Sequence, residues 1–244
     1  MFFRPIIFLI LLLSISTFSL PQSCVVYKKE KDGIFIGADT RMVTYINDEK
    51  TQQVETSYSS LCKIEQVNNF NFAITGHGGN ISLDEARKAC RNEKLLPEVV
   101  KYYAVTFGQK LADMLETDRH TKPAFYKKKF LAGRNLGGSL FFHYENGVLI
   151  GLAVKFVLVS QPQDRATIST HTENMDSIGI MGSEIGIKRI VFNKDVWNKG
   201  TVNAINNLIG IEKMANPVEL GGIVDILFVS NKNQLEWIQR KACN

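Results

Sequence analysis

Residues 23–41, SCVVYKKEKDGIFIGADTR, predict a β-hairpin. Residues 24–27 are mostly β-branched or aromatic, and residues 34–38 are apolar with one glycine among them. The Asp-Gly pair between the two runs favours a two-residue turn, because both residue types tolerate positive φ. Antiparallel strands meet at the open end of a hairpin, so we expect Ser23 and Asp39 to lie side by side.

A hydroxyl beside a carboxylate can form a nucleophile site, but a strand-end aspartate is also a common turn or cap residue. The order strand, Asp-Gly turn, strand and Ala-Asp-Thr-Arg resembles the start of a mature proteasome-type β subunit, a member of the N-terminal nucleophile (Ntn) hydrolases. In that family the first residue after processing is a threonine. Its spacing to the aspartate matches the spacing from Ser23 to Asp39 without a gap.

The resemblance covers nearly all of the chain after residue 22 and implies a single domain at residues 23–244. The expected fold class is α+β, as a four-layer αββα sandwich with two antiparallel sheets between helical layers. Sequential hairpins also favour antiparallel over parallel sheets. The chain has 244 residues, of which 45% are hydrophobic, so it is long and apolar enough to bury a core.

The charge pattern argues against a nucleic-acid partner. The net charge is +5, and the basic residues are scattered except for the triplet at residues 127–129. No aromatic-interleaved basic run or nucleic-acid motif accompanies this triplet, so we interpret it as a solvated face.

The first residues have the three-part form of a secretory signal peptide. Arg4 precedes an apolar run at residues 6–13, and small polar residues follow. We expect residues 1–19 to be removed, or residues up to 22 if the cut falls directly before Ser23. The run is too short to favour a spanning helix, for which about 20 apolar residues are needed. The mature protein is therefore expected to be secreted or periplasmic, without a stable membrane anchor.

A second hairpin is predicted from the alternating residues 61–67 and the apolar residues 70–74. A lysine in such a strand usually lies on the solvent face. In the family the first strand of this hairpin carries an essential lysine, which corresponds to Lys63. Held by Asp39, its ammonium would lower the cost of deprotonating the nucleophile. The polar segment at residues 42–60 is longer than the corresponding connection in the family. We interpret it as an insertion that can overhang the site.

A glycine-rich loop follows the second hairpin. The family has a glycine here whose backbone N–H contributes to the oxyanion hole, and Gly76 is the best match, with Gly78 as the alternative. His77 between them is either a base or incidental. No Lys-Ser/Thr pair completes a phosphate-binding loop. Ser82 and Glu85 are predicted to form a capping box at the start of the next helix.

The remaining elements are assigned by periodicity and turn signals. Ser183 follows a short apolar strand and resembles the family's Gly-Ser turn, where it would help to hold the amine and Lys63; it could equally be a helix N-cap. Residues 155–175 are less regular, and no element is assigned to them. Helices are expected at residues 84–90, 97–117, 185–192 and 201–214, and strands at residues 137–144, 148–154, 176–181, 221–229 and 235–238.

The four cysteines are Cys24, Cys62, Cys90 and Cys243. An exported protein with four cysteines can form up to two disulfides, although four buried apolar side chains are the alternative. Their spacings fit no zinc motif, so we expect no metal, and the sequence indicates no cofactor. Ser23 precedes Cys24 in the chain, and Lys63 follows Cys62. If Ser23 and Lys63 point to one site, alternation along a strand makes Cys24 and Cys62 both point away from it. This predicts a disulfide between Cys24 and Cys62.

The main departure from the family lies before the Gly221-Gly222 pair. The family carries an aspartate and a serine that support the nucleophile, where this chain has Pro217 and Leu220. Neither side chain can donate or accept a hydrogen bond.

The resulting expectation is an exported Ntn hydrolase that cleaves an amide or peptide bond in a peptide or small amide substrate. Its site residues would be Ser23, Asp39, Lys63, Gly76 and Ser183. Two alternatives remain: a catalytically silent scaffold or binding protein, and an amidase in which Cys24 is the nucleophile. A homo-oligomer is compatible with the resemblance.

Overall fold

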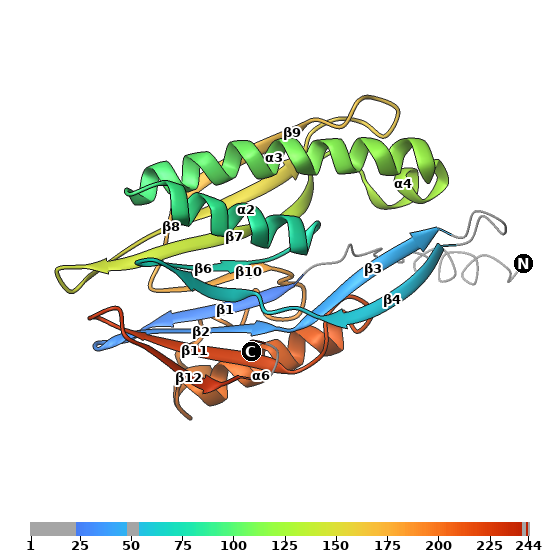
Figure 1. Cartoon of the computed structure of the whole chain (residues 1–244). Coiled ribbons are helices and arrows are strands. Elements are labelled where there is room, and N and C mark those ends of the chain that lie inside the picture. The colour runs from blue at the N-terminus through green and yellow to red at the C-terminus, as the bar shows by residue number, and fades with distance from the viewer. Residues whose placement is uncertain (1–22, 48–53, 241–242, 244) are drawn as a thin grey trace, which may run out of the picture.

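The computed structural model describes residues 23–47, 54–240 and 243 (Figure 1). The fold is mixed α+β and contains two five-stranded antiparallel sheets, a two-stranded sheet and several helices. Within these described ranges, no helix has both the length and the apolar character needed to cross a membrane. The expected signal peptide lies outside the described residues.

The first sheet contains the two strands of the predicted opening hairpin, but the predicted Asp-Gly turn is wrong. Gly33 is already the first residue of the second strand, neither Asp32 nor Gly33 has a positive φ, and the N–H of Glu30 donates to the Gly33 carbonyl at 2.8 Å, so Lys31 and Asp32 lie at the turn. Val25 pairs with Ala38 in an antiparallel register, which brings Ser23 and Asp39 to the same end of the pair. The predicted strands at residues 176–181, 221–229 and 235–238 also belong to this sheet. In spatial order its strands are β10 (Ile178–Gly182), β1 (Cys24–Lys29), β2 (Gly33–Asp39), β11 (Val224–Ser230) and β12 (Leu235–Gln239).

The second sheet is built from sequential hairpins. The predicted Asn-Gly turn is present, because Asn146 and Gly147 both have positive φ. Residues 155–175, whose sequence is less regular and predicts no element, contribute an edge strand. That strand is mostly exposed and polar, so it carries no alternating hydrophobic signal. The strands are β5 (Ile64–Val67), β6 (Phe70–Ile74), β7 (Arg134–Glu145), β8 (Val148–Leu158) and β9 (Ile168–Asn174).

The insertion forms a separate β-hairpin. Among the strands that the structure describes, β3 (Arg41–Asn47) and β4 (Val54–Ser60) pair only with each other. Figure 1 shows this hairpin extending past the end of the first sheet, beside α4. The tyrosine ring of Tyr45 on β3 contacts the ring of Phe125 on α4, with centroids 5.1 Å apart.

The helices agree with the sequence in part. The helices predicted at 97–117 and 201–214 are present, but residues 185–192 form turns with mixed hydrogen-bond spacings, because Gly186 and several β-branched residues lower helix propensity there. The helix expected at 84–90 is longer. The helices are α2 (Gly79–Asn92), α3 (Leu96–Thr121), α4 (Pro123–Lys129), α5 (Lys194–Trp197) and α6 (Thr201–Ala215).

The predicted capping box is wrong. Helix α2 begins at Gly79, three residues before Ser82, and its N-cap is Gly78 with a φ of 73°. Ser82 is therefore inside the first turn, where its hydroxyl lies 2.7 Å from the hydroxyl of Tyr103 on α3. Glu85 instead forms ion pairs through its carboxylate with lysines on α2 and α3. These contacts join α2 to α3, which the local sequence pattern could not indicate.

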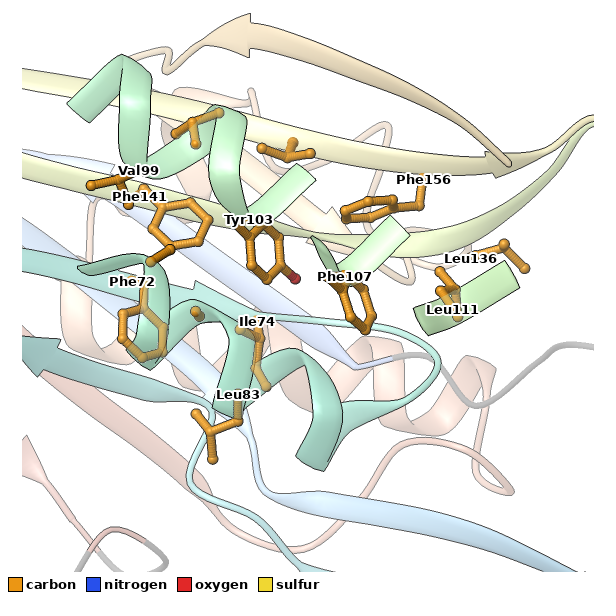
Figure 2. Packing of buried hydrophobic residues seen from close by; sticks show 14 of the residues in the cluster. Phe72, Ile74, Leu83, Val99, Tyr103, Phe107, Leu111, Leu136, Phe141 and Phe156 are labelled. Atoms are coloured by element: carbon orange, nitrogen blue, oxygen red, sulfur yellow. The ribbon is translucent and has the colours of Figure 1, made fainter. Parts of the chain in front are cut away.

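Buried apolar residues form three clusters. The first lies between α2, α3 and the second sheet, and Figure 2 shows Tyr103 and Phe107 of α3 beside Phe141 and Phe156 of that sheet. The second cluster joins residues of both five-stranded sheets, and the third joins the first sheet to α6. Each fully buried large apolar side chain contributes about 1.5–3 kcal/mol. The three clusters therefore hold the sheets and helices together.

The predicted disulfide between Cys24 and Cys62 is wrong. Cys62 is bonded to Cys243, whereas Cys24 and Cys90 are buried free thiols. Cys24 belongs to the cluster under α6, while Cys62 precedes the second sheet. Cys24 lies on a strand of the first sheet and packs toward α6, so it does not meet Cys62 at the start of the second sheet. A disulfide fits an oxidising, extracytoplasmic compartment.

Candidate active site

Asp39 is the centre of the candidate site. Its side chain has no exposed surface and lies at the end of β2. One carboxylate oxygen accepts the backbone N–H of Cys24 at 2.8 Å, and the other accepts the N–H of Gly221 at 3.4 Å. Ser23 immediately precedes β1 and is 7% exposed. The hairpin register and these hydrogen bonds therefore hold the Ser23 end of β1 against Asp39.

Lys63 forms a buried ion pair with Asp39. Its Nζ lies 3.0 Å from Asp39 Oδ1 and donates a second hydrogen bond, of 2.7 Å, to the carbonyl of Arg41. The sequence predicts Lys63 within a strand at residues 61–67, but β5 begins at Ile64, so Lys63 directly precedes the strand. Burial lowers the pKa of the Lys63 ammonium, and the Asp39 carboxylate opposes this shift. An ammonium held in this way can stabilise a developing negative charge nearby.

Gly76 follows β6 in a conformation that requires glycine. Its φ is 91°, and a Cβ atom would overlap the carbonyl oxygen of Leu136 and the backbone of Gly137. The next residue, His77, is fixed because its N–H donates to the Leu136 carbonyl at 2.8 Å. Gly78 also has positive φ. The loop thus places two glycines with positive φ at the cleft that Ser23 also lines.

Ser23, Lys63 and Gly76 line one cleft with a volume of about 400 Å³. The insertion forms one wall through residues 41–45 of β3, and the C-terminal half of α3 contributes Met114 and Asp118. The volume is within the usual range for small-molecule and peptide sites, which is about 300–1,000 Å³. The predicted overhang of the insertion therefore corresponds to a wall of this cleft.

Ser183 lies next to Ser23 but not in the predicted manner. Its backbone N–H donates to the Ser23 carbonyl at 2.9 Å. Its hydroxyl is fully buried and donates to the Glu212 carboxylate, and it is not among the residues that line the cleft. Ser183 therefore fixes the Ser23 main chain, whereas its side chain belongs to a separate buried contact.

Glu212 is a residue of this region that the sequence motifs do not indicate. It is fully buried on α6, and its carboxylate also accepts the N–H groups of Ile185 at 2.9 Å and Gly186 at 2.7 Å. The apolar stripe of α6 continues through Leu208 to this position, one turn later. A glutamate on the buried face of an amphipathic helix is the signal that could have identified it.

Arg41 ends the opening motif, and it also lines the cleft. Its guanidinium donates to the carbonyl of Pro217 at 2.6 Å and lies over the ring of Tyr58. A Cβ at Gly221 would overlap the guanidinium group, so the glycine allows this close approach. Leu220 is buried in the cluster under α6.

His77 is neutral in this environment. Its side chain is 12% exposed, and burial lowers its pKa to about 4. Nε2 lies 4.0 Å from the Asp118 carboxylate and has no hydrogen-bond partner among the described residues. A neutral imidazole can accept or donate a hydrogen bond, but it adds no charge to the cleft.

Cys24, unlike Ser23, does not line the cleft. Its thiol is fully buried, and burial together with Asp39 raises its pKa well above the usual value. Thiolates are the reactive form, so this environment disfavours a nucleophilic Cys24. Among the residues that the structure describes, no group of three or more His, Cys, Asp or Glu side chains could hold a metal ion.

Comparison of the chain with models of known protein families gives no match, and comparison with curated proteins gives none either.

Proposed function

We propose that the protein is an exported Ntn hydrolase that cleaves an amide or peptide bond with Ser23 as its nucleophile after processing. We also propose that its two sheets and outer helices form the four-layer αββα sandwich of that superfamily, in a single domain at residues 23–244. The observation that carries the proposal is the buried Lys63–Asp39 pair, 3.0 Å apart, because Lys63 lines the same cleft as Ser23.

In the proposed reaction, the Ser23 Oγ attacks the substrate carbonyl. The α-amine of Ser23, freed by removal of residue 22, takes the hydroxyl proton and gives it to the leaving amine as the C–N bond breaks, which leaves an acyl ester on Ser23. A water molecule, deprotonated by the same α-amine, then attacks this ester, and the acid product leaves as the proton returns to the Ser23 Oγ. An unperturbed α-amine has a pKa of about 8, which suits this role near neutral pH. Lys63, oriented by Asp39, stabilises the negative charge that develops at Ser23.

The oxyanion of the tetrahedral intermediate needs hydrogen-bond donors. The N–H of Gly76 is the proposed donor, with the N–H of Gly78 as the alternative, and such a donor typically contributes about 10²–10³ in rate. Ser183 is proposed to act on the Ser23 main chain through its own N–H, because its hydroxyl is bonded to Glu212.

A second candidate function is a catalytically silent member that retains the fold for binding or assembly. Two observations favour it. Pro217 contributes only its carbonyl oxygen, to Arg41, and Leu220 is buried in apolar surroundings. The polar groups that the family uses in this segment to support the nucleophile are therefore missing.

The deciding experiment is mass spectrometry of the exported protein together with an amide-substrate panel. The hydrolase proposal expects a mature chain that begins at Ser23, and it expects Ser23→Ala to abolish hydrolysis while the thermal unfolding transition remains. A mature N-terminus at Leu20, together with equal hydrolysis of every substrate by Ser23→Ala and the unchanged protein, would reject the hydrolase proposal. The catalytically silent scaffold would then be the supported function.

A further inference from the structure

Among the described residues that line the cleft, one cation has no carboxylate as a partner. Asp39 is paired with Lys63, Asp118 lies 3.0 Å from Lys122, and Glu219 lies 3.8 Å from Lys129. The remaining charged residue that lines the cleft is Arg41. Within the part of the chain that the structure describes, it has a carbonyl and an aromatic ring as partners, but no carboxylate within ion-pair distance.

Two neighbouring lysines lie within electrostatic reach of Arg41, and the Asp39 carboxylate opposes its effect on the pKa of both. Burial is the main cause that lowers the pKa of Lys63 and of Lys213, and the charge of Arg41 lowers both further. Lys213 lies on α6, and its Nζ donates to the carbonyl of Gly222 at 2.7 Å. Lys63 and Lys213 are thus two further cations near Arg41, and neither can neutralise its charge.

The missing carboxylate corresponds to the departure from the family pattern. Where the resemblance implies an aspartate, this chain has Pro217, and it is the carbonyl of this residue that accepts the hydrogen bond from Arg41. A carbonyl oxygen satisfies one of the five N–H donors of a guanidinium and does not neutralise its charge. An arginine that is hydrogen-bonded only to a main-chain carbonyl at the wall of a cleft can still donate its remaining guanidinium N–H groups to a ligand.

We propose that the cleft takes a substrate that carries a carboxylate, and that Arg41 is the residue that recognises it. That this ligand is a substrate rests on the proposed function, whereas its binding to Arg41 does not require hydrolysis. A planar guanidinium and a carboxylate form paired, charge-assisted hydrogen bonds that a lysine cannot reproduce in the same geometry. The carboxylate belongs to an acidic side chain or to a free chain terminus.

The test uses two matched peptide pairs and the purified exported protein. The first pair is acetyl-Ala-Ala-Glu-amide and acetyl-Ala-Ala-Gln-amide, and the second is acetyl-Ala-Ala-Ala with a free or an amidated C-terminus. Calorimetry measures binding, and kcat/KM is compared wherever a peptide is hydrolysed. We expect the carboxylate form of one pair to be favoured by about 10- to 100-fold, the range of hydrogen bonds to charged groups. The pair that shows the preference identifies the source of the carboxylate.

Variants assign the preference to Arg41. Arg41→Gln should remove it, whereas Lys101→Gln, which removes a positive charge from an exposed position on α3 outside the cleft, should retain it. If Arg41→Gln does not fold, Arg41→Lys keeps the charge and loses the fork, and should reduce the preference to a few-fold that salt abolishes. A preference that survives at Arg41→Gln, equal affinity within both pairs, or no binding at all overturns the inference.

The outcomes separate this inference from the proposed function. Hydrolysis of carboxylate and amide peptides at equal rates would support the hydrolase proposal and reject carboxylate recognition by Arg41. A preference for carboxylate that depends on Arg41, in a protein that hydrolyses no peptide, would support the inference and reject the hydrolase.

Discussion

Lys63 Nζ lies 3.0 Å from Oδ1 of Asp39, and neither side chain is more than 3% exposed. Two opposite charges buried together depend on each other, because either one alone would lie uncompensated in a medium of low polarity. The same carboxylate oxygen accepts the N–H of Cys24, so the pair also fixes the start of β1. This contact joins the two sheets at the candidate nucleophile.

Breaking the pair from one side should destabilise the protein strongly. We expect Lys63→Met to lower the free energy of unfolding by about 3–5 kcal/mol, since it leaves the Asp39 charge buried without its partner. Adding Asp39→Asn should restore part of this loss, because the double variant buries no charge. Denaturant unfolding of the two single variants and the double variant gives the coupling energy. Strictly additive effects would mean that the two charges do not interact.

Acid should weaken the fold through His77. Its pKa is about 4 in the folded protein against the ordinary 6.5, so between these values the unfolded chain binds a proton that the folded chain does not. The free energy of unfolding should therefore fall as the pH is lowered from about 6.5 to about 4, by up to roughly 3 kcal/mol.

The histidine contribution is isolated with His77→Gln, which keeps a polar side chain and does not titrate. Urea unfolding across this pH range should show a shallower loss of stability than in the unchanged protein. His171→Gln, at an exposed position on β9, serves as the control. Identical pH profiles for the unchanged protein and His77→Gln would contradict a buried neutral histidine.

The disulfide should contribute substantially to stability, because it closes a long loop. Cys62 and Cys243 are separated by 181 residues, for which the chain-entropy model gives about 5 kcal/mol. Replacing both with serine should lower the thermal unfolding temperature. A reducing agent should do the same to the unchanged protein and have no further effect on the double variant. Non-reducing peptide mapping should recover Cys62 joined to Cys243, and recovery of Cys62 with another cysteine would refute the pairing.

Gly76→Ala should be more damaging than a glycine replacement elsewhere with a similar φ. Gly133 has a φ of 82°, and a Cβ atom at this position would meet open space, so Gly133→Ala should cost only the backbone term of about 1 kcal/mol. Gly76→Ala adds an overlap with the Leu136 carbonyl. Chemical denaturation should therefore show a larger loss in the free energy of unfolding for Gly76→Ala than for Gly133→Ala. Equal losses would mean that the loop around Gly76 can shift to accommodate the added Cβ atom.

Local chemistry in the sequence determined the elements that need no distant partner. The apolar runs at residues 24–27 and 34–38 indicate the two strands of the opening hairpin, and their antiparallel register brings Ser23 and Asp39 to one end. The helices at 97–117 and 201–214 follow from apolar residues repeated at helical spacing. Lys63 is indicated by the resemblance, and the fold brings it to Asp39 from the other sheet.

The tertiary structure decided whatever depends on segments far apart in the chain. The partner of Cys62 lies 181 residues away, and β9 is a strand because β8 offers it an edge, not because of its own pattern. Ser183 turns its hydroxyl to Glu212, a contact across 29 positions that no local spacing encodes. Turns and periodicities are fixed by neighbours along the chain, whereas pairings across the fold depend on which surfaces the packed sheets and helices bring together.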